Sequence, residues 1–218
     1  MTDYTLIIGN KNYSSWSLRP WLAMTVARIP FREVLLPIRE GSWDRDIGKY
    51  SPSRRVPVLQ HGDVTVWDSL AIVEYLAERH PETRLWPAEA PARALARSAT
   101  AEMHSSFSAL RRHMPMNLRA SLPGRGRKDG VAADIARIVE LWGDCRARAD
   151  GAGPFLFGAF SAADAFFAPV VTRFQTYAVE LPDEAAAYRD AVLALPALID
   201  WYGSARSEPW TIGEDEVD

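Results

Sequence analysis

Cysteine is almost absent from this chain of 218 residues, which contains only one, Cys145. A single cysteine cannot form an internal disulfide bond, and no Cys-x-x-Cys pair exists for dithiol exchange. The four histidines lack the spacing of metal ligands. The sequence therefore predicts a protein of a reducing compartment, whose chemistry uses neither a dithiol nor a metal. Cys145 lies on a helical apolar stripe and is expected to be a small buried residue.

Long apolar runs and a strong charge of one sign are also missing. No apolar run approaches the ~20 residues that span a bilayer. The first residues lack the basic segment and apolar stretch of a secretory signal. The net charge is only −3, so no basic surface for nucleic acid is expected. We therefore expect a cytoplasmic protein that binds neither membrane nor nucleic acid, with 48% apolar residues to build a core.

The first eighty residues combine the patterns of strands and helices. Runs rich in β-formers lie at residues 5–8, 34–38, 56–60 and 64–67. A Gly62 turn joins the last two runs as a hairpin. Apolar residues recur at helical spacing over 18–29 and 70–77. This order predicts a small mixed sheet with helices on its faces, forming an α/β domain over residues 1–81.

The rest of the chain shows only helical patterns. Residues 82–91 are rich in proline and have no periodicity, as expected of a linker. Apolar stripes then predict helices at 95–114, 131–145, 161–178, 188–195 and 196–202. The acidic tail from Gly213 to Asp218 is expected to fray. We therefore predict an all-α helical bundle domain over residues 92–218.

A cluster of serines, Ser14, Ser15 and Ser17, separates the first strand from the first helix. Proline is tolerated in the first turn of a helix, where its missing N–H would have no partner. The position of Pro20 therefore predicts an N-cap at Ser15 to Ser17, with Ser14 just outside the helix. A hydroxyl there lies beside free N–H groups at the positive end of a helix dipole, a ready site for an anion. Simple helix capping would explain the same serines.

Two further features have both a binding and a structural interpretation. Pro57 begins a strand after a bond that can be cis, which frees the backbone of Val56 to pair with an extended, peptide-like ligand. Asp68 and Ser69 precede a helix and could bind the ammonium and carboxylate of an amino acid. A turn into an edge strand and a helix cap are the structural alternatives. A fourth feature, Ser161 to Asp164, is interpreted as a purely structural capping box.

In their order and spacing, these features resemble the glutathione transferase superfamily over nearly the whole chain. Residues 56–59, Val-Pro-Val-Leu, resemble its cis-proline strand. Residues 68–76 are similar to its Glu-Ser-x-Ala-Ile-x-x-Tyr-Leu signature, with Asp in place of Glu, and residues 161–164 to its C-terminal capping box. Residues 14–19, Ser-Ser-Trp-Ser-Leu-Arg, look closest to the Ser-Ser-Cys-Ser-x-Arg of the zeta class, which includes maleylacetoacetate isomerase.

The resemblance implies a thioredoxin-like first domain that binds glutathione, a helical second domain that supplies the second-substrate pocket, and a homodimer. It implies that Ser14 donates to the glutathione sulfur with support from Ser15 and Ser17. The other implied glutathione contacts are the backbone of Val56 beside Pro57 for the cysteinyl part, and Asp68 with Ser69 for the γ-glutamyl end. Candidates for the glycyl carboxylate are Trp43, Lys49 and Arg54.

Two departures from the zeta pattern affect the expected reaction. Trp16 replaces a cysteine and would reshape the mouth of the site. The arginine that the class uses for its substrate carboxylate would fall near Thr176, which is not basic, while Arg173 lies one turn earlier. The second-substrate pocket is expected along the first C-terminal helix, at Met103, Phe107 and Arg111, although Met103 and Phe107 could equally be bundle core.

The sequence thus predicts a glutathione transferase that activates glutathione as a thiolate through a serine hydroxyl, for attack on a small, hydrophobic electrophile. The alternatives are a glutathione-dependent cis–trans isomerase of the maleylacetoacetate type, a peroxide reductase, or a non-catalytic binding protein with the same fold.

Overall fold

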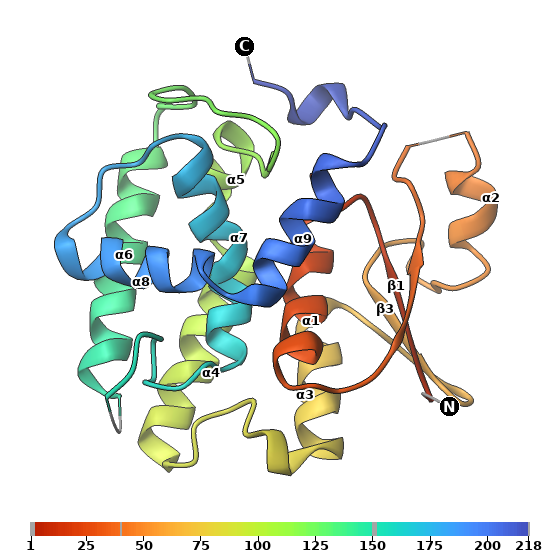
Figure 1. Cartoon of the computed structure of the whole chain (residues 1–218), viewed down its shortest axis with the longest axis horizontal. Coiled ribbons are helices and arrows are strands. Elements are labelled where there is room, and N and C mark those ends of the chain that lie inside the picture. Colours follow the sequence, from red (N-terminus) through yellow and green to blue (C-terminus); the bar gives the residue numbers. More distant parts are fainter. Residues whose placement is uncertain (1–2, 40, 150–151, 218) are drawn as a thin grey trace.

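The computed structural model describes residues 3–39, 41–149 and 152–217, in which a small sheet lies beside a group of helices (Figure 1). The sheet has four strands: β1 (Tyr4–Ile8), β2 (Arg32–Leu35), β3 (Val58–His61) and β4 (Val64–Trp67). Their order is β2-β1-β3-β4, with β1 parallel to β2 and antiparallel to β3, and β3 antiparallel to β4. The mixed sheet predicted from the sequence is confirmed.

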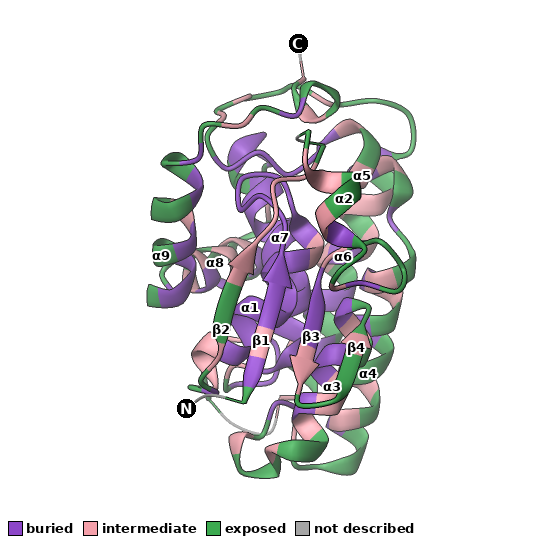
Figure 2. Ribbon diagram, turned by 90° about the vertical axis from the view of Figure 1, so that its right-hand side faces the viewer, coloured by how far each residue is buried: buried purple, intermediate pink, exposed green. Residues whose placement is uncertain are grey.

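Alternation along β1 explains why both faces of the sheet are covered. Leu6 and Ile8 point to one face and join the main core with α1 (Ser15–Val26) and α3 (Ser69–Arg79). Ile7 points to the other face and is also buried. The short helix α2 (Trp43–Ile47), which lies across the sheet from α1 in Figure 1, contributes the buried Ile47. Figure 2 shows β1 buried throughout most of its length and β2 exposed at the sheet edge.

The second half of the chain is helical, as predicted. It contains α4 (Ala90–Ser105), α5 (Ser108–His113), α6 (Val131–Ala147), α7 (Ala162–Thr176), α8 (Asp183–Leu193) and α9 (Pro196–Arg206). Short 3-10 turns, η1 (Pro81–Thr83) and η2 (Gly213–Asp215), lie before α4 and in the C-terminal segment. None of the helices in the described part of the chain has the length and apolar character needed to cross a membrane.

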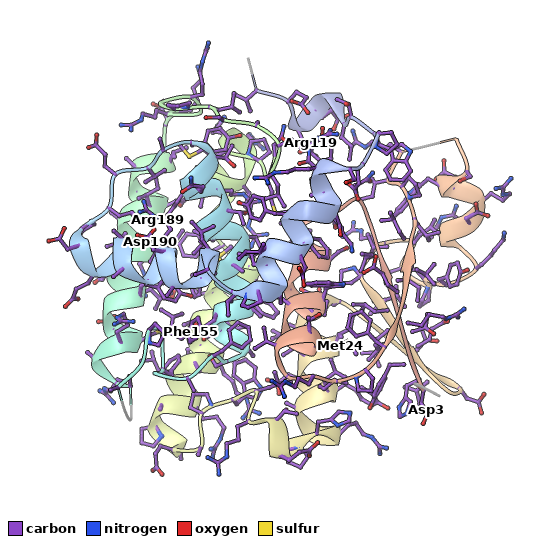
Figure 3. All side chains as sticks on the ribbon, in the orientation of Figure 1. Asp3, Met24, Arg119, Phe155, Arg189 and Asp190 are labelled. Atoms are coloured by element: carbon purple, nitrogen blue, oxygen red, sulfur yellow. The ribbon has the colours of Figure 1, made fainter. Side chains whose placement is uncertain are left out.

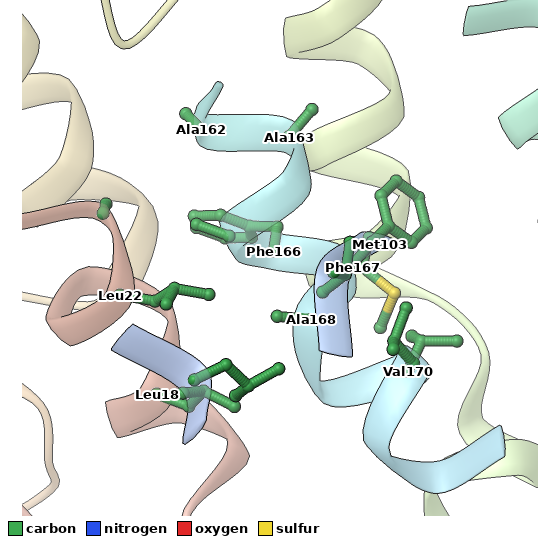
Figure 4. Packing of buried hydrophobic residues seen from close by; sticks show 14 of the residues in the cluster. Leu18, Leu22, Met103, Ala162, Ala163, Phe166, Phe167, Ala168 and Val170 are labelled. Carbon is green, nitrogen blue, oxygen red and sulfur yellow. The ribbon is translucent and has the colours of Figure 1, made fainter. Parts of the chain in front are cut away.

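Helix α7 is the centre of the core, because it packs against α1 of the sheet half and against α4. Nearly all its side chains are buried. In Figure 4, Leu18 and Leu22 of α1 face Phe166 and Ala168 of α7. Burial of a leucine or phenylalanine side chain contributes about 1.5–3 kcal/mol. The two halves are therefore joined by a continuous apolar core rather than by surface contacts.

The start of α7 is secured by the capping box that the sequence predicts. The buried Asp164 carboxylate accepts hydrogen bonds from the Ser161 N–H at 2.8 Å and the Ser161 hydroxyl at 2.9 Å. Its other oxygen accepts from the Leu156 N–H at 3.0 Å, which ties the preceding loop to the helix. Burial raises the pKa of Asp164 to about 6, against the hydrogen bonds, which lower it.

Three local predictions differ from the structure. Pro20 lies inside α1 and not in its first turn, so the N-cap is Ser14 and not a residue between Ser15 and Ser17. The missing proline N–H removes one intrahelical bond, which the buried packing of α1 offsets. The stripe at 95–114 forms two helices, because Phe107 adopts a left-handed conformation (φ 62°) and inserts into the core between α4 and α5.

The C-terminal tail is the third difference. Residues 213–215 form a 3-10 turn, and the Glu216 carboxylate accepts hydrogen bonds from Asn117 Nδ2 at 3.0 Å and from the Tyr13 hydroxyl. The prediction of fraying is therefore wrong for the described part of the tail, because polar side chains from other elements hold it. Asp218 lies outside the described residues.

Candidate functional site

The serine cluster lies at the N-terminus of α1 and is buried. Ser14 is the N-cap, and its Oγ accepts from the Ser17 N–H at 3.3 Å. The Ser14 hydroxyl donates to Ser17 Oγ at 2.7 Å, and Ser17 Oγ also accepts from the Gly9 N–H at 3.0 Å. Within the described residues, the Ser15 hydroxyl has no hydrogen-bond partner. The hydroxyls of Ser14 and Ser15 thus lie at the positive end of the helix, and that of Ser14 is hydrogen-bonded to Ser17, which in turn accepts from the Gly9 N–H.

The loop that carries these serines is held by the C-terminal half of the chain. The buried carboxylate of Glu208 accepts from the N–H groups of Lys11 at 2.7 Å and Asn12 at 3.0 Å. The Trp201 indole donates to the Lys11 carbonyl at 2.9 Å, and Asn12 Nδ2 donates to Asn117 Oδ1 at 3.0 Å. These bonds satisfy the backbone of a buried loop and fix where α1 begins.

Two neighbouring cavities lie beside the serine cluster and the segment that precedes β3. The serine cavity, of about 460 Å³, is lined by Ser14, Ser15 and residues of the tail and of α7. The proline cavity, of about 490 Å³, is lined by Pro57, Asp68 and Ser69 among others. Both cavities share Trp16, Arg55 and Val56, so together they form one continuous surface. The six glutathione contacts proposed from the sequence all lie on it: Ser14, Ser15, Val56, Pro57, Asp68 and Ser69.

The middle of this surface is the backbone before β3. The Val56–Pro57 peptide bond is cis. Within the described residues, no hydrogen bond engages the backbone N–H or carbonyl of Val56, which precedes the first paired residue of the strand, Val58. An extended ligand could therefore pair there as an additional strand segment.

The far end of the surface is the start of α3. Asp68 is its N-cap and has a left-handed backbone (φ 73°), uncommon for a residue other than glycine. Its Oδ1 accepts from the Leu70 N–H at 2.8 Å, while much of the side chain stays exposed. Ser69 is fully buried, and its Oγ accepts from Arg19 at 3.4 Å. The helix cap is therefore confirmed, whereas binding of an amino-acid group by this pair, which also lines a cavity, stays a prediction.

Arginines dominate the electrostatics of the serine cavity, whose wall contains Arg39, Arg55, Arg111 and Arg173. Arg173 is buried, and it donates to the carbonyls of Met114 at 2.9 Å and Pro169 at 3.0 Å. Burial, with nearby Arg111, lowers the pKa of Arg173 to about 10, so it remains cationic at neutral pH. Thr176 donates instead to the Asn117 carbonyl, and the basic group reaches the cavity from one turn earlier.

The C-terminal segment closes one side of the serine cavity with acidic groups. Glu214 forms an ion pair with Arg39, and Asp215 lines the same wall as Arg173. Burial raises the pKa of Asp215, and the charges of Arg173 and Arg39 oppose that rise. Arg119, seen in Figure 3 beside this segment, donates to the carbonyls of Glu208 and Trp210, both at 2.7 Å.

Trp16 divides the two cavities and is held by cations. The guanidinium carbons of Arg19 and Arg111 lie 4.1 Å and 4.9 Å from the centroid of its ring, within cation–π range. Arg19 is itself fully buried, and its pKa is lowered by burial and then by Arg111 and Arg173. The bulky residue that departs from the zeta pattern therefore shapes the passage between the cavities.

Some residues proposed from the sequence lie elsewhere. Met103 and Phe107 are buried in the main core and line neither cavity, so of the three predicted second-substrate residues only Arg111 faces one. Lys49 and Arg54 turn toward Asp46 and Asp44 of α2, whereas Trp43 lines the serine cavity.

The residues that sequence reasoning missed are Arg39, Arg55, Glu214 and Asp215, which lie in loops and the tail without any periodic signal. Among the described residues, no group of three or more His, Cys, Asp or Glu side chains is placed to hold a metal ion.

Comparison with known proteins identifies related sequences for both parts of the chain. The family models described as glutathione S-transferase, N-terminal domain and C-terminal domain match residues 13–79 and 90–204. The chain is 27% identical over 172 residues to glutathione S-transferase Z2 of Arabidopsis thaliana, which covers 74% of each chain. It is 29% identical over 127 residues to maleylacetoacetate isomerase of Dictyostelium discoideum, covering 57% of this chain and 56% of that one.

Among solved structures, a glutathione transferase homologue from Burkholderia with bound glutathione has a TM-score of 0.71 at 22% identity, covering 94% of this chain and 99% of that one. This likeness confirms the thioredoxin-like domain with a helical C-terminal part, and the sequence relatives confirm the zeta-like resemblance. The match of the two family models over most of its length shows that this chain belongs to the glutathione S-transferase family.

Proposed function

We propose that the chain binds glutathione in an extended conformation along the serine and proline cavities and activates its thiol as a thiolate. One observation carries the proposal. Three groups of residues far apart in the sequence, at 14–15, 56–57 and 68–69, line two cavities that meet at Val56. An extended tripeptide spans about 10 Å. Asp68 and Ser69 would hold the γ-glutamyl end, Val56 the cysteinyl backbone, and the serines the sulfur.

The Ser14 hydroxyl is proposed to donate to the sulfur, with Ser15 in a supporting position. A free thiol has a pKa near 8.5, and lowering that pKa by two units requires about 2.7 kcal/mol of preferential stabilisation of the thiolate. A charge-assisted hydroxyl bond contributes about 1.5–3 kcal/mol, and a helix N-terminus about 0.3–1 kcal/mol. Hydroxyl protons rotate, so reversal of the Ser14–Ser17 bond would leave Ser14 free to donate while Ser17 donates to it.

For the glycyl carboxylate of glutathione, the structure favours a residue that was not among the sequence candidates. Arg55 lies on both cavities, and its side chain has no partner within the described residues, whereas Lys49 and Arg54 are engaged with α2. A guanidinium binds a carboxylate through two parallel N–H groups. Arg55 is therefore the proposed ligand of this carboxylate.

The experiment that tests the proposal is a binding measurement followed by an ultraviolet titration of the bound thiol. We expect glutathione to bind in calorimetry with a dissociation constant below a millimolar, and its thiolate absorbance to develop well below pH 8 on the protein. Failure to bind glutathione would contradict the proposal. Binding with a thiol pKa that stays near 8.5 would favour a non-catalytic binding protein.

The reaction of the activated thiol is proposed to be attack on an electrophilic carbon, in which the S–C bond forms as the leaving group departs with its electron pair. The arginine-rich wall favours an electrophile that carries a carboxylate, whereas the sequence predicted a small, hydrophobic electrophile. Arg173 is the best candidate to bind that group, because it is buried, cationic and on the cavity wall.

The arginine-rich wall of the serine cavity also supports a second candidate function, the cis–trans isomerisation of an anionic, conjugated substrate. In that reaction the sulfur adds to an alkene carbon, and the electron pair moves to a conjugated carbonyl oxygen. After rotation about the single bond, the pair returns and expels the sulfur, so glutathione is regenerated. The relative named maleylacetoacetate isomerase is consistent with this candidate. Turnover without net consumption of glutathione would distinguish it from conjugation.

Replacing Arg173 with glutamine is expected to raise the KM for an anionic electrophile about tenfold, the effect of losing one hydrogen-bonded charge. A chloronitrobenzoate and its uncharged carboxamide form a matched pair of substrates for steady-state kinetics, because the KM for the carboxamide should change less than about threefold. Arg173→Lys keeps the charge and is the control variant. Equal losses for both substrates would argue for a structural role of Arg173 instead.

A further inference from the structure

His104, on α4 of the helical half, contacts the part of the site that the sheet half contributes. Its Nε2 lies 3.4 Å from Asp68 Oδ2, and its Nδ1 lies 3.5 Å from Arg19 Nη1. The same Nη1 lies 3.4 Å from Ser69 Oγ. One histidine is therefore linked both to Asp68 and, through Arg19, to Ser69.

The partners of His104 select one protonation state of the ring. Arg19 can only donate hydrogen bonds, so Nδ1 must accept and carries no proton. In the neutral imidazole the proton then sits on Nε2, where it is donated to the carboxylate of Asp68. Since the other oxygen of Asp68 accepts from the Leu70 N–H, both of its oxygens are held. This arrangement keeps the carboxylate in place on a backbone of positive φ.

Protonation of His104 would disturb this arrangement in two ways. A proton on Nδ1 would place two donors face to face at Arg19, which breaks the link to Ser69. A positive ring 3.4 Å from Asp68 would also reduce the attraction of that carboxylate for an incoming ammonium group.

We propose that neutral His104 is a positioning residue of the glutathione site, which orients Asp68 and Ser69 for the γ-glutamyl end and loosens that hold when it is protonated. The inference rests on the proposed function, because it concerns the same ligand. It assigns to the helical half a role in binding the first substrate, in addition to its arginines that face the second.

The surroundings of the ring decide in which direction pH acts. Asp68 at the start of α3 favours the charged ring, whereas Arg19 of α1 and Arg111 of α5 oppose it. Trp16 and Phe166, on α1 and α7, contribute uncharged aromatic surface at ring-centroid distances of 5.1 Å and 6.2 Å. Burial is the largest effect and lowers the pKa of His104. Because that pKa lies below the usual histidine value, the neutral, binding form prevails at neutral pH, and affinity is lost only as the pH falls into the acidic range.

The test uses S-methylglutathione, which has no thiol to titrate, in calorimetry between about pH 5 and pH 8. For the unchanged protein we expect affinity to fall about tenfold over this range, the equivalent of one hydrogen bond to a charged group. His104→Gln retains an acceptor and a donor on one planar group. It should bind within about threefold of the unchanged protein at pH 8 and show no such pH dependence. His104→Leu should bind about tenfold more weakly at pH 8.

His113→Gln, at the end of α5 and outside this cluster, is the matched control and should keep the full pH dependence. Circular dichroism melts establish that each variant is folded at each pH. A His104→Gln variant with unchanged pH dependence, or a His104→Leu variant with unchanged affinity at pH 8, would overturn the inference while leaving the proposed function intact. If the unchanged protein binds no S-methylglutathione at any pH, the proposed function itself fails and the inference fails with it.

Discussion

Replacing Ser14 with alanine is expected to return the pKa of bound glutathione to near 8.5 and to lower kcat/KM about 100-fold at neutral pH. The thiolate would lose its donor, and the polar chain through Ser17 to the Gly9 N–H would no longer end at the sulfur. Because a tenfold loss of thiolate accompanies each unit of pKa, the two effects should track each other. Thiolate absorbance and steady-state kinetics on the same variant provide the measurement.

Ser14 also caps α1, so the alanine variant loses about 1 kcal/mol of helix stability in addition to its hydroxyl. Ser14→Thr restores both the cap and a donor and is expected to recover most of the activity. Ser204→Ala, an exposed serine on α9, is the control for substitution itself. If the bound thiol of Ser14→Ala keeps its low pKa, the donor is Ser15, and Ser15→Ala should then show the larger effect.

Replacing Asp164 with alanine is expected to destabilise the folded chain by about 3–5 kcal/mol. The substitution leaves the buried N–H groups of Leu156 and Ser161 without their acceptor, at about 1–3 kcal/mol each, and removes the cap of the central helix. For a chain of this length, each kcal/mol lowers the melting temperature by about 2–4 °C. Urea unfolding and thermal melting measure the effect.

The matched control for this prediction is Asp183→Ala, an exposed acid in the first turn of α8. It should change the free energy of unfolding by less than about 0.5 kcal/mol. A loss at Asp164 no larger than that at Asp183 would show that the capping box is dispensable and that the apolar packing of α7 alone holds the helix.

Most secondary structure was predictable from local pattern. The β-rich runs became β1 to β4, and the stripe at 131–145 became α6, because period and apolar spacing are properties of neighbouring residues. At Pro20 and Phe107 the local pattern predicted the wrong structure, since Pro20 lies inside a helix and Phe107 separates two helices. The tertiary core around α1 accommodates a proline inside a helix, and the burial of Phe107 outweighs the cost of its left-handed backbone.

The candidate site was predictable where its residues belong to motifs. The serines, the Val56–Pro57 pair and Asp68 with Ser69 were named from helix starts and a strand start, and all line the two cavities. Arg39 and Arg55 could not be named this way, and Arg173 was noted only because it lies one turn before Thr176. A charged residue in a loop or on a helix carries no local sign of which cavity it will face, and only its burial and neighbours reveal that.

By itself, the sequence determined an α/β part followed by helices, a chain without a dithiol, and a set of hydroxyl and carboxylate groups at helix starts. These are consequences of residue type and spacing along the chain. Only the tertiary structure decided that Met103 and Phe107 belong to the core, that arginines surround the serine cavity, and that His104 meets Asp68. The physical reason is that burial and electrostatics depend on which segments pack together, and packing joins residues far apart in the sequence.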